Sequence, residues 1–93
     1  MKNDNAIETA VEAHELEKIL QEIREMAQRH SDFFFFEKIE NALTCLCLEM
    51  HFREEFEREI LDGAAQILRA HGARDLDFGG EEKIDARWIV ATF

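Results

Sequence analysis

Hydrophobic and polar residues follow a helical period over the first third of the chain. At about 100° per residue, seven positions fall in one apolar arc, namely Leu16, Ile19, Leu20, Ile23, Met26, Ala27 and His30. Ile7 and Val11 lie outside this arc, so the first two turns are expected to fray or to pack elsewhere. The pattern predicts a helix over residues 6–30, and the polar residues 1–5 are expected to be disordered.

Residues 33–52 contain five of the eight phenylalanines and both cysteines, so this stretch is expected to lie in the core. Two structures are compatible with its pattern. A helix over residues 33–50 would carry apolar side chains on two sides and would be buried on both. As strands, residues 33–40 and 43–52 would pair as a hairpin that turns at Asn41-Ala42, and residues 46–52 alternate correctly for a strand.

Turn and capping residues favour the helix in this stretch. Asn41 is not followed by glycine, and neither glycine nor proline occurs from residue 31 to residue 62. No Ser, Thr, Asp or Asn lies between Cys45 and Leu61 to cap a helix that begins after a strand. We therefore predict a helix over residues 33–50 and keep the hairpin as the alternative.

The next segment, residues 53–71, has a clear helical period. Its apolar face consists of Phe56, Ile60, Ala64, Ile67, Leu68 and His71. Gly63 lies inside this helix, where it is unfavourable relative to alanine by about 1 kcal/mol. It indicates close approach of a neighbouring helix, with a hinge as the alternative. Gly72 directly follows the pattern and is expected to form the C-terminal cap.

The last segment, residues 75–93, changes to the alternation of a β-hairpin, with Gly79-Gly80 as the expected turn. The predicted fold is therefore a single α+β domain over residues 1–93. It has three helices (about 6–30, 33–50 and 53–71) and a C-terminal hairpin (about 75–93). The alternative is an α-β-β-α-β-β arrangement, in which residues 33–52 are a hairpin in a four-stranded antiparallel sheet.

The chain has a formal net charge of −10, from 21 acidic and 11 basic residues. This charge disfavours direct binding to nucleic acid or to an anionic membrane and favours a partner protein with a basic surface. Cys45 and Cys47 lie in apolar surroundings, and residues 1–30 lack the pattern of a signal peptide. These features predict a cytoplasmic protein.

Sequence motifs do not indicate an enzyme or a cofactor. Ser31 is the only serine, no acid–base–nucleophile motif is present, and Cys45-Leu46-Cys47 lacks the spacing of a C-x-x-C motif. His14 precedes Glu17 by three residues, and His51 precedes Glu54 and Glu55 by three and four. On helices these pairs would share a face, so a metal-binding helical protein is a second alternative function. No catalytic, cofactor-binding or metal-binding residue is assigned.

Carboxylates along the first and last predicted helices are the candidate partner-binding residues: Glu8, Glu12, Glu15, Glu22, Glu25, Glu54, Glu55, Glu57, Glu59 and Asp62. We predict a small, non-enzymatic interaction protein that acts as an inhibitor, immunity-type antagonist or adaptor on a basic surface of a larger protein. Mimicry of nucleic-acid charge is one form this interaction can take. The first alternative function is a self-associating structural or assembly module, with a homodimer contact through Phe33–Phe36.

Overall fold

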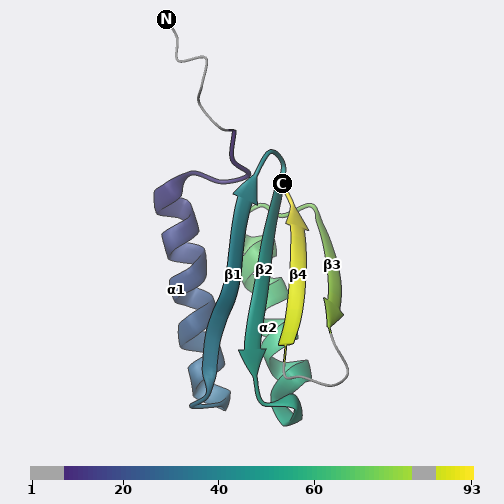
Figure 1. Ribbon diagram of the computed structural model, residues 1–93. Helices are drawn as coiled ribbons and strands as arrows, with labels where there is room; N and C mark the ends of the chain where they lie inside the picture. The colour runs from purple at the N-terminus through teal and green to yellow at the C-terminus, as the bar shows by residue number, and fades with distance from the viewer. Residues whose placement is uncertain (1–7, 81–85) are drawn as a thin grey trace, which may run out of the picture.

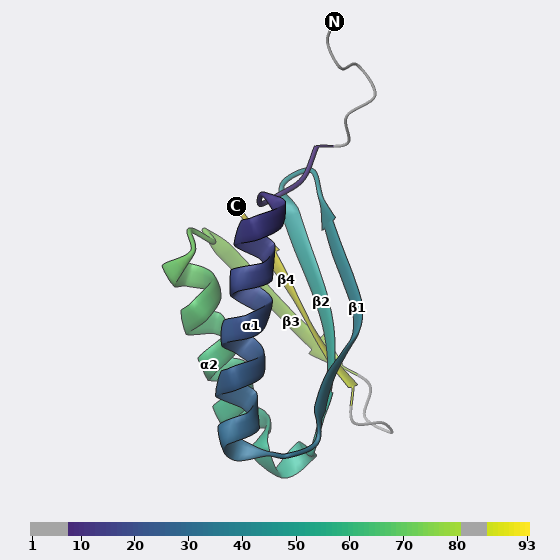
Figure 2. The same ribbon diagram turned by 90° about the vertical axis from the view of Figure 1, so that its left-hand side faces the viewer.

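The computed structural model describes residues 8–80 and 86–93, which form one four-stranded sheet and two helices. The elements are, in order, α1 (Ala13–His30), β1 (Phe34–Ala42), β2 (Cys45–Phe52), a 3-10 turn (Glu54–Phe56), α2 (Glu57–Ala70), β3 (Asp75–Gly80) and β4 (Ala86–Thr92). Neighbouring strands pair antiparallel in the order β1-β2-β4-β3. Both helices lie on one face of the sheet and run in opposite directions (Figure 1, Figure 2). The fold is therefore α+β.

The predicted helix over residues 33–50 is wrong, because this stretch forms strands β1 and β2. Phe34 pairs with Phe52 and Ala42 pairs with Cys45, so the stretch is a hairpin as in the alternative prediction, but in a different register. Burial alternates strictly along β2, where every second residue faces the helices and is buried. Apolar side chains occur on both faces of these two strands, and this is why the pattern also fits a helix that is buried on two sides.

The hairpin turns at Leu43 and Thr44, two residues later than the Asn41-Ala42 turn of the alternative prediction. Leu43 has a φ of +58°, in the left-handed region that usually favours glycine. Its backbone N–H donates a hydrogen bond of 2.9 Å to the carbonyl oxygen of Glu8, which fixes the turn against the preceding segment. A tight turn therefore forms without glycine, and the absence of glycine does not exclude a hairpin.

Asn41 ties the segment before α1 to the sheet. Its Oδ1 accepts hydrogen bonds from the backbone N–H groups of Ala10 (2.8 Å) and Val11 (3.1 Å), and its Nδ2 donates to the Val11 carbonyl (2.8 Å). Val11 is 9% exposed and packs in the core from outside the helix, as its position off the helical arc predicted. Consequently α1 begins at Ala13 rather than near residue 6. The predicted disorder of residues 1–5 and the position of Ile7 lie outside the described residues.

The second helix, α2, begins at Glu57, directly after the 3-10 turn and without a side-chain cap on its first N–H groups. The lack of a capping residue therefore does not exclude a helix after a strand. A Cβ atom at Gly63 would lie 2.6 Å from Sδ of Met26, so the predicted close approach of a neighbouring helix is confirmed. Gly72 has a φ of +104° and ends the helix as predicted.

The C-terminal hairpin is confirmed as β3 and β4, but the predicted Gly79-Gly80 turn is wrong. Both glycines belong to β3 and pair with Trp88 and Arg87 of β4. The connection between the strands, residues 81–85, lies outside the described residues. The Trp88 ring lies against Gly79, where an added Cβ would be 2.0 Å from Cζ2 of the indole. The glycine is therefore required by the close approach of the ring.

One face of the sheet packs against both helices, and within the described residues no layer covers the other face (Figure 2). The largest fully buried side chains lie between the sheet and the helices: Ile19, Ile23, Leu46, Leu48, Met50, Phe52, Ile60, Leu68 and Ile89. The strand register places the alternate residues on the uncovered side. We call this side the open sheet face; it contains Phe33, Phe35, Glu37, Lys38, Glu40, Cys45, Cys47, Glu49, His51, Asp75, Asp77, Trp88, Val90 and Thr92.

Candidate functional site

Two of the candidate carboxylates on α1 bind the histidine that follows α2. Nδ1 of His71 contacts the Glu15 carboxylate, and its Nε2 lies 3.2 Å from Oε1 of Glu22. The His71 side chain is only 13% exposed, so solvent screens this pairing less than it would at an open surface. The hydrogen bond with Glu15 is the main cause that raises the pKa of His71 and lowers the pKa of Glu15. Both carboxylates therefore join the two helices.

Replacing His71 by glutamine is expected to lower the free energy of unfolding by about 1 kcal/mol near pH 6, and by less at a pH above the raised folded-state pKa of His71. Because the folded-state pKa of His71 is raised, its stabilisation is complete below the unfolded value and is lost as pH rises through the folded value. The lowered pKa of Glu15 means that its stabilisation is lost as pH falls through that lower value.

Urea unfolding of the wild type and His71→Gln at both pH values measures this effect. His14→Gln is the matched control, because the His14 side chain is 68% exposed and lies 3.6 Å from Glu12, a carboxylate of its own helix end. The control is expected to keep the wild-type pH dependence. An unchanged slope of stability against pH in His71→Gln would contradict the pairing.

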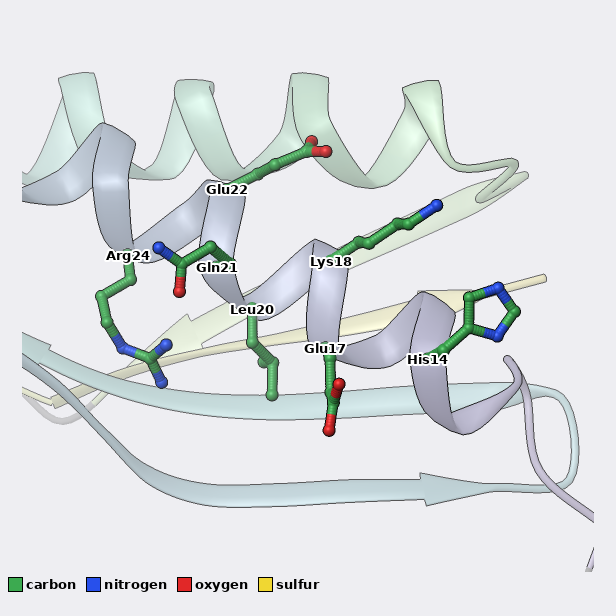
Figure 3. A pocket seen from close by; sticks show the side chains of 7 residues that line it. All are labelled: His14, Glu17, Lys18, Leu20, Gln21, Glu22 and Arg24. Atoms are coloured by element: carbon green, nitrogen blue, oxygen red, sulfur yellow. The ribbon is translucent and has the colours of Figure 1, made fainter.

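The other candidate carboxylates of α1 do not converge on one site. Glu25 accepts a hydrogen bond of 2.7 Å from Gln21, and Glu8 is exposed before the helix begins. A hollow of about 670 Å³ runs along α1 and is lined by His14, Glu17, Lys18, Leu20, Gln21, Glu22 and Arg24 (Figure 3). In Figure 3 Glu22 and Lys18 point away from the sheet, whereas Leu20 points toward it. The charged groups of this hollow therefore surround the helix instead of facing a common point.

Most of the candidate carboxylates at the beginning of α2 do come together. A hollow of about 520 Å³ lies between the start of this helix and strand β3, and we call it the acidic hollow. It is lined by Glu54, Glu55, Glu57, Arg58, Leu61, Asp62 and Phe78. Phe78 is on the helix-facing side of the edge strand β3, beyond the cover of α2, and is 43% exposed. Glu59, the remaining candidate on α2, is exposed and does not line the hollow.

The carboxylates that line the acidic hollow differ in their contacts and in their exposure. Oε1 of Glu57 accepts a hydrogen bond of 3.1 Å from Nη2 of Arg87, whose side chain is 13% exposed. Glu54, Glu55 and Asp62 are exposed. Carboxylates at the beginning of a helix are stabilised by its dipole, which explains Glu57 in the first turn of α2 without a ligand. The exposed Phe78 ring among these carboxylates has no such explanation.

The open sheet face carries a second group of exposed aromatic side chains. Phe33, Phe35 and Trp88 are 40%, 43% and 40% exposed. The Phe35 ring stacks on the His51 imidazole, with centroids 4.7 Å apart and planes 1° apart, and Phe33 packs edge-to-face on Phe35. Phe34 and Phe36 point to the helix side instead. The proposed dimer contact through Phe33–Phe36 is therefore divided between two faces of the sheet.

Both thiols lie on the open sheet face. Cys45 and Cys47 are free and half-buried, on the same side of β2. Burial is the main cause that raises the pKa of Cys47, and the nearby Glu40 carboxylate adds to it. Because a raised pKa disfavours the reactive thiolate, Cys47 is better explained as part of an apolar surface than as a redox residue.

In the described part of the chain no group of three or more His, Cys, Asp or Glu side chains is arranged to hold a metal ion, although His14 and Glu17 both lie on α1 and line the hollow there. His51 lies on a strand, so Glu54 and Glu55 do not share a helical face with it. Its Nε2 instead lies 3.4 Å from Glu37 and 3.9 Å from Glu49.

Two residues of these surfaces were not identified from the sequence, namely Phe78 of the acidic hollow and Trp88 of the open sheet face, whereas Phe35 and His51 were considered only for a dimer contact and for metal binding. If residues 33–36 form a strand, Phe33 and Phe35 must lie on one face of the sheet and Phe34 and Phe36 on the other. This inference was not open to the preferred prediction of a helix. Phe78 could not be linked to α2 from local pattern, because the contact depends on how the sheet and the helix pack.

Comparison with protein-family models and with curated proteins finds no match to this chain. The fold and the surfaces therefore define its class: a small acidic α+β protein with two helices on one face of an antiparallel sheet. Within the described residues, neither helix combines the length and the apolar character that a membrane span requires.

Proposed function

We propose that this chain is a non-enzymatic interaction protein that binds a basic surface of a larger cytoplasmic protein, as an inhibitor, immunity-type antagonist or adaptor. The observation that carries the proposal is the acidic hollow. Three exposed carboxylates, Glu54, Glu55 and Asp62, line this hollow together with the exposed Phe78 ring and, among the described residues, outnumber its one exposed cation, Arg58. Charge and apolar surface together fit a protein ligand better than either does alone.

The chemistry of the hollow suits an arginine or lysine side chain of the partner. The aliphatic part of such a side chain can pack on Phe78 and Leu61, while its charged end reaches the carboxylates. A guanidinium group can also bind the face of the phenylalanine ring and pair with a carboxylate through two hydrogen bonds. An arginine at the centre of the partner's basic surface is the ligand that uses all of these groups.

This proposal reduces the number of predicted carboxylates that are expected to contact the partner. Among those on α1, Glu15 and Glu22 are engaged by His71, and Lys18, Arg24 and Arg29 are interspersed along that helix. An extended track of charge that imitates a nucleic-acid backbone requires free carboxylates along both helices. The proposal therefore favours a compact acidic contact over nucleic-acid mimicry.

The test is to immobilise the chain, capture and identify a partner from the native host, and titrate that purified partner by calorimetry. Asp62→Lys is expected to weaken binding about tenfold or more, and raising NaCl from about 50 mM to about 300 mM is expected to weaken wild-type binding. The matched control is Glu17→Lys, which makes the same charge change on α1 outside the hollow. Equal losses in both variants, or affinity independent of salt, would contradict the proposal.

A further inference from the structure

We infer that the open sheet face is a separate docking surface, and that its occupant is an amphipathic basic helix of a partner protein. The inference concerns a different surface from the acidic hollow and does not depend on it. Two helices already cover the other face of the same sheet (Figure 2), so a helix laid on the open sheet face would complete a three-layer arrangement.

The dimensions of the face suit a helix. Strand β2 runs through the middle of the open sheet face and is eight residues long. At about 3.3 Å per residue it spans about 26 Å, the length of a helix of about 18 residues. The aromatic groups lie toward one end of this stripe, with Phe35 and His51 paired across β1 and β2, and Trp88 on β4 opposite Glu49.

The aromatic groups are held in place by the fold before anything binds. Phe35 is fixed between the parallel His51 ring and the edge-to-face contact with Phe33. The Trp88 ring lies across Gly79, which leaves no room for a side chain beneath it. A hollow of about 280 Å³ beside Trp88 is large enough for an aliphatic side chain; Cys47 and Val90 line it together with the charged residues Lys38, Glu40 and Glu49. Fixed aromatic anchors lose little conformational entropy on binding.

The charges on the open sheet face determine which charge a bound partner should carry. The described residues of this face include five carboxylates, Glu37, Glu40, Glu49, Asp75 and Asp77, and one ammonium group, that of Lys38. A second copy of the chain would bring two acidic surfaces together, which is repulsive. A helix with an apolar stripe and Lys or Arg residues along its flanks would match both the aromatic centre and the carboxylates. Charge complementarity therefore favours a basic partner over self-association.

The probe for the test is a synthetic amphipathic peptide of about 18 residues, with leucine on one side and lysine on the other. Trp88 is the only tryptophan, so its fluorescence reports on the open sheet face directly. The lysine peptide is expected to shift the emission to shorter wavelength, with affinity that decreases as salt is raised. The same peptide with glutamate in place of lysine is expected to give no shift.

Two variants localise the binding. Phe35→Ser is expected to weaken binding of the lysine peptide about tenfold or more. Ile39→Ser is the matched control, because Ile39 lies on the same strand, points to the opposite face and is similarly exposed (39% against 43%). Asp77→Lys changes a rim charge on the edge strand without removing an aromatic side chain. It is expected to weaken binding of the lysine peptide severalfold. This second variant keeps the test decisive if Phe35→Ser fails to fold.

Three outcomes would overturn the inference. The first is equal binding of the lysine and glutamate peptides. The second is an equal effect of Phe35→Ser and Ile39→Ser, or no effect of Asp77→Lys. The third is a dimer in sedimentation that dissociates in Phe35→Ser, which would make a second copy the occupant. Asp62→Lys, in the acidic hollow, is expected to weaken binding of the captured partner but not binding of the lysine peptide. Failure of one proposal is therefore distinguishable from failure of the other.

Discussion

Replacing Phe52 by alanine is expected to lower the free energy of unfolding by about 3–5 kcal/mol. Phe52 is 1% exposed at the end of β2, and its ring stacks on Phe34 with centroids 6.3 Å apart. Its removal leaves a cavity between the sheet and the helices that surrounding side chains can fill only in part. Since small domains are stable by only about 5–15 kcal/mol, this one change removes a large part of the total.

Urea unfolding followed by circular dichroism measures the loss. Phe35→Ala is the matched control, because Phe35 is 43% exposed on the open sheet face and its loss is expected to cost about 1 kcal/mol or less. The difference in stability between the two variants therefore tests whether successive residues of β1 and β2 alternate between the buried face and the open sheet face. Comparable losses at both positions would indicate that residues 33–52 do not divide between a buried and an open face.

Replacing Gly79 by alanine is expected to lower the free energy of unfolding by about 1–3 kcal/mol and to change the environment of Trp88. The added Cβ would lie 2.0 Å from the indole ring, so the ring must move off the sheet or β3 must move away from β4. Either movement exposes more of the indole to water, and its emission is expected to shift to longer wavelength.

The control for this effect is Asp77→Ala, on the same strand and the same face, where a side chain is already present. It is expected to leave the Trp88 emission unchanged and to alter stability by less than about 0.5 kcal/mol. Unchanged emission and an unchanged urea midpoint in Gly79→Ala would show that Trp88 does not lie across the glycine.

Periodicity was sufficient to predict the elements with a single dominant pattern. The apolar arc of residues 16–30 and the face of residues 56–71 correspond to α1 and α2, and residues 75–93 do contain a hairpin. It was not sufficient for residues 33–52, because apolar side chains occur among the residues of both faces of β1 and β2, and such a pattern fits a helix as well. Leu43 in the left-handed region then replaced the glycine that a turn would normally signal.

The candidate surfaces were less predictable than the fold, because each depends on contacts between distant segments. The sequence carries the carboxylates, but not the fact that His71 lies between Glu15 and Glu22. In the same way, the sequence does not show that Phe78 of β3 and Asp62 of α2 line the same hollow. The open sheet face depends on the sheet itself, which the preferred prediction of three helices did not contain.

The most direct test of the proposed function is amide hydrogen exchange of the chain alone and in complex with the captured partner. The acidic hollow is formed by residues 54–62 and by Phe78 in β3, so these segments are expected to exchange more slowly in the complex. Slower exchange in β1 and β2 as well would indicate that the same partner also covers the open sheet face. Protection confined to α1, with residues 54–62 unchanged, would contradict the account.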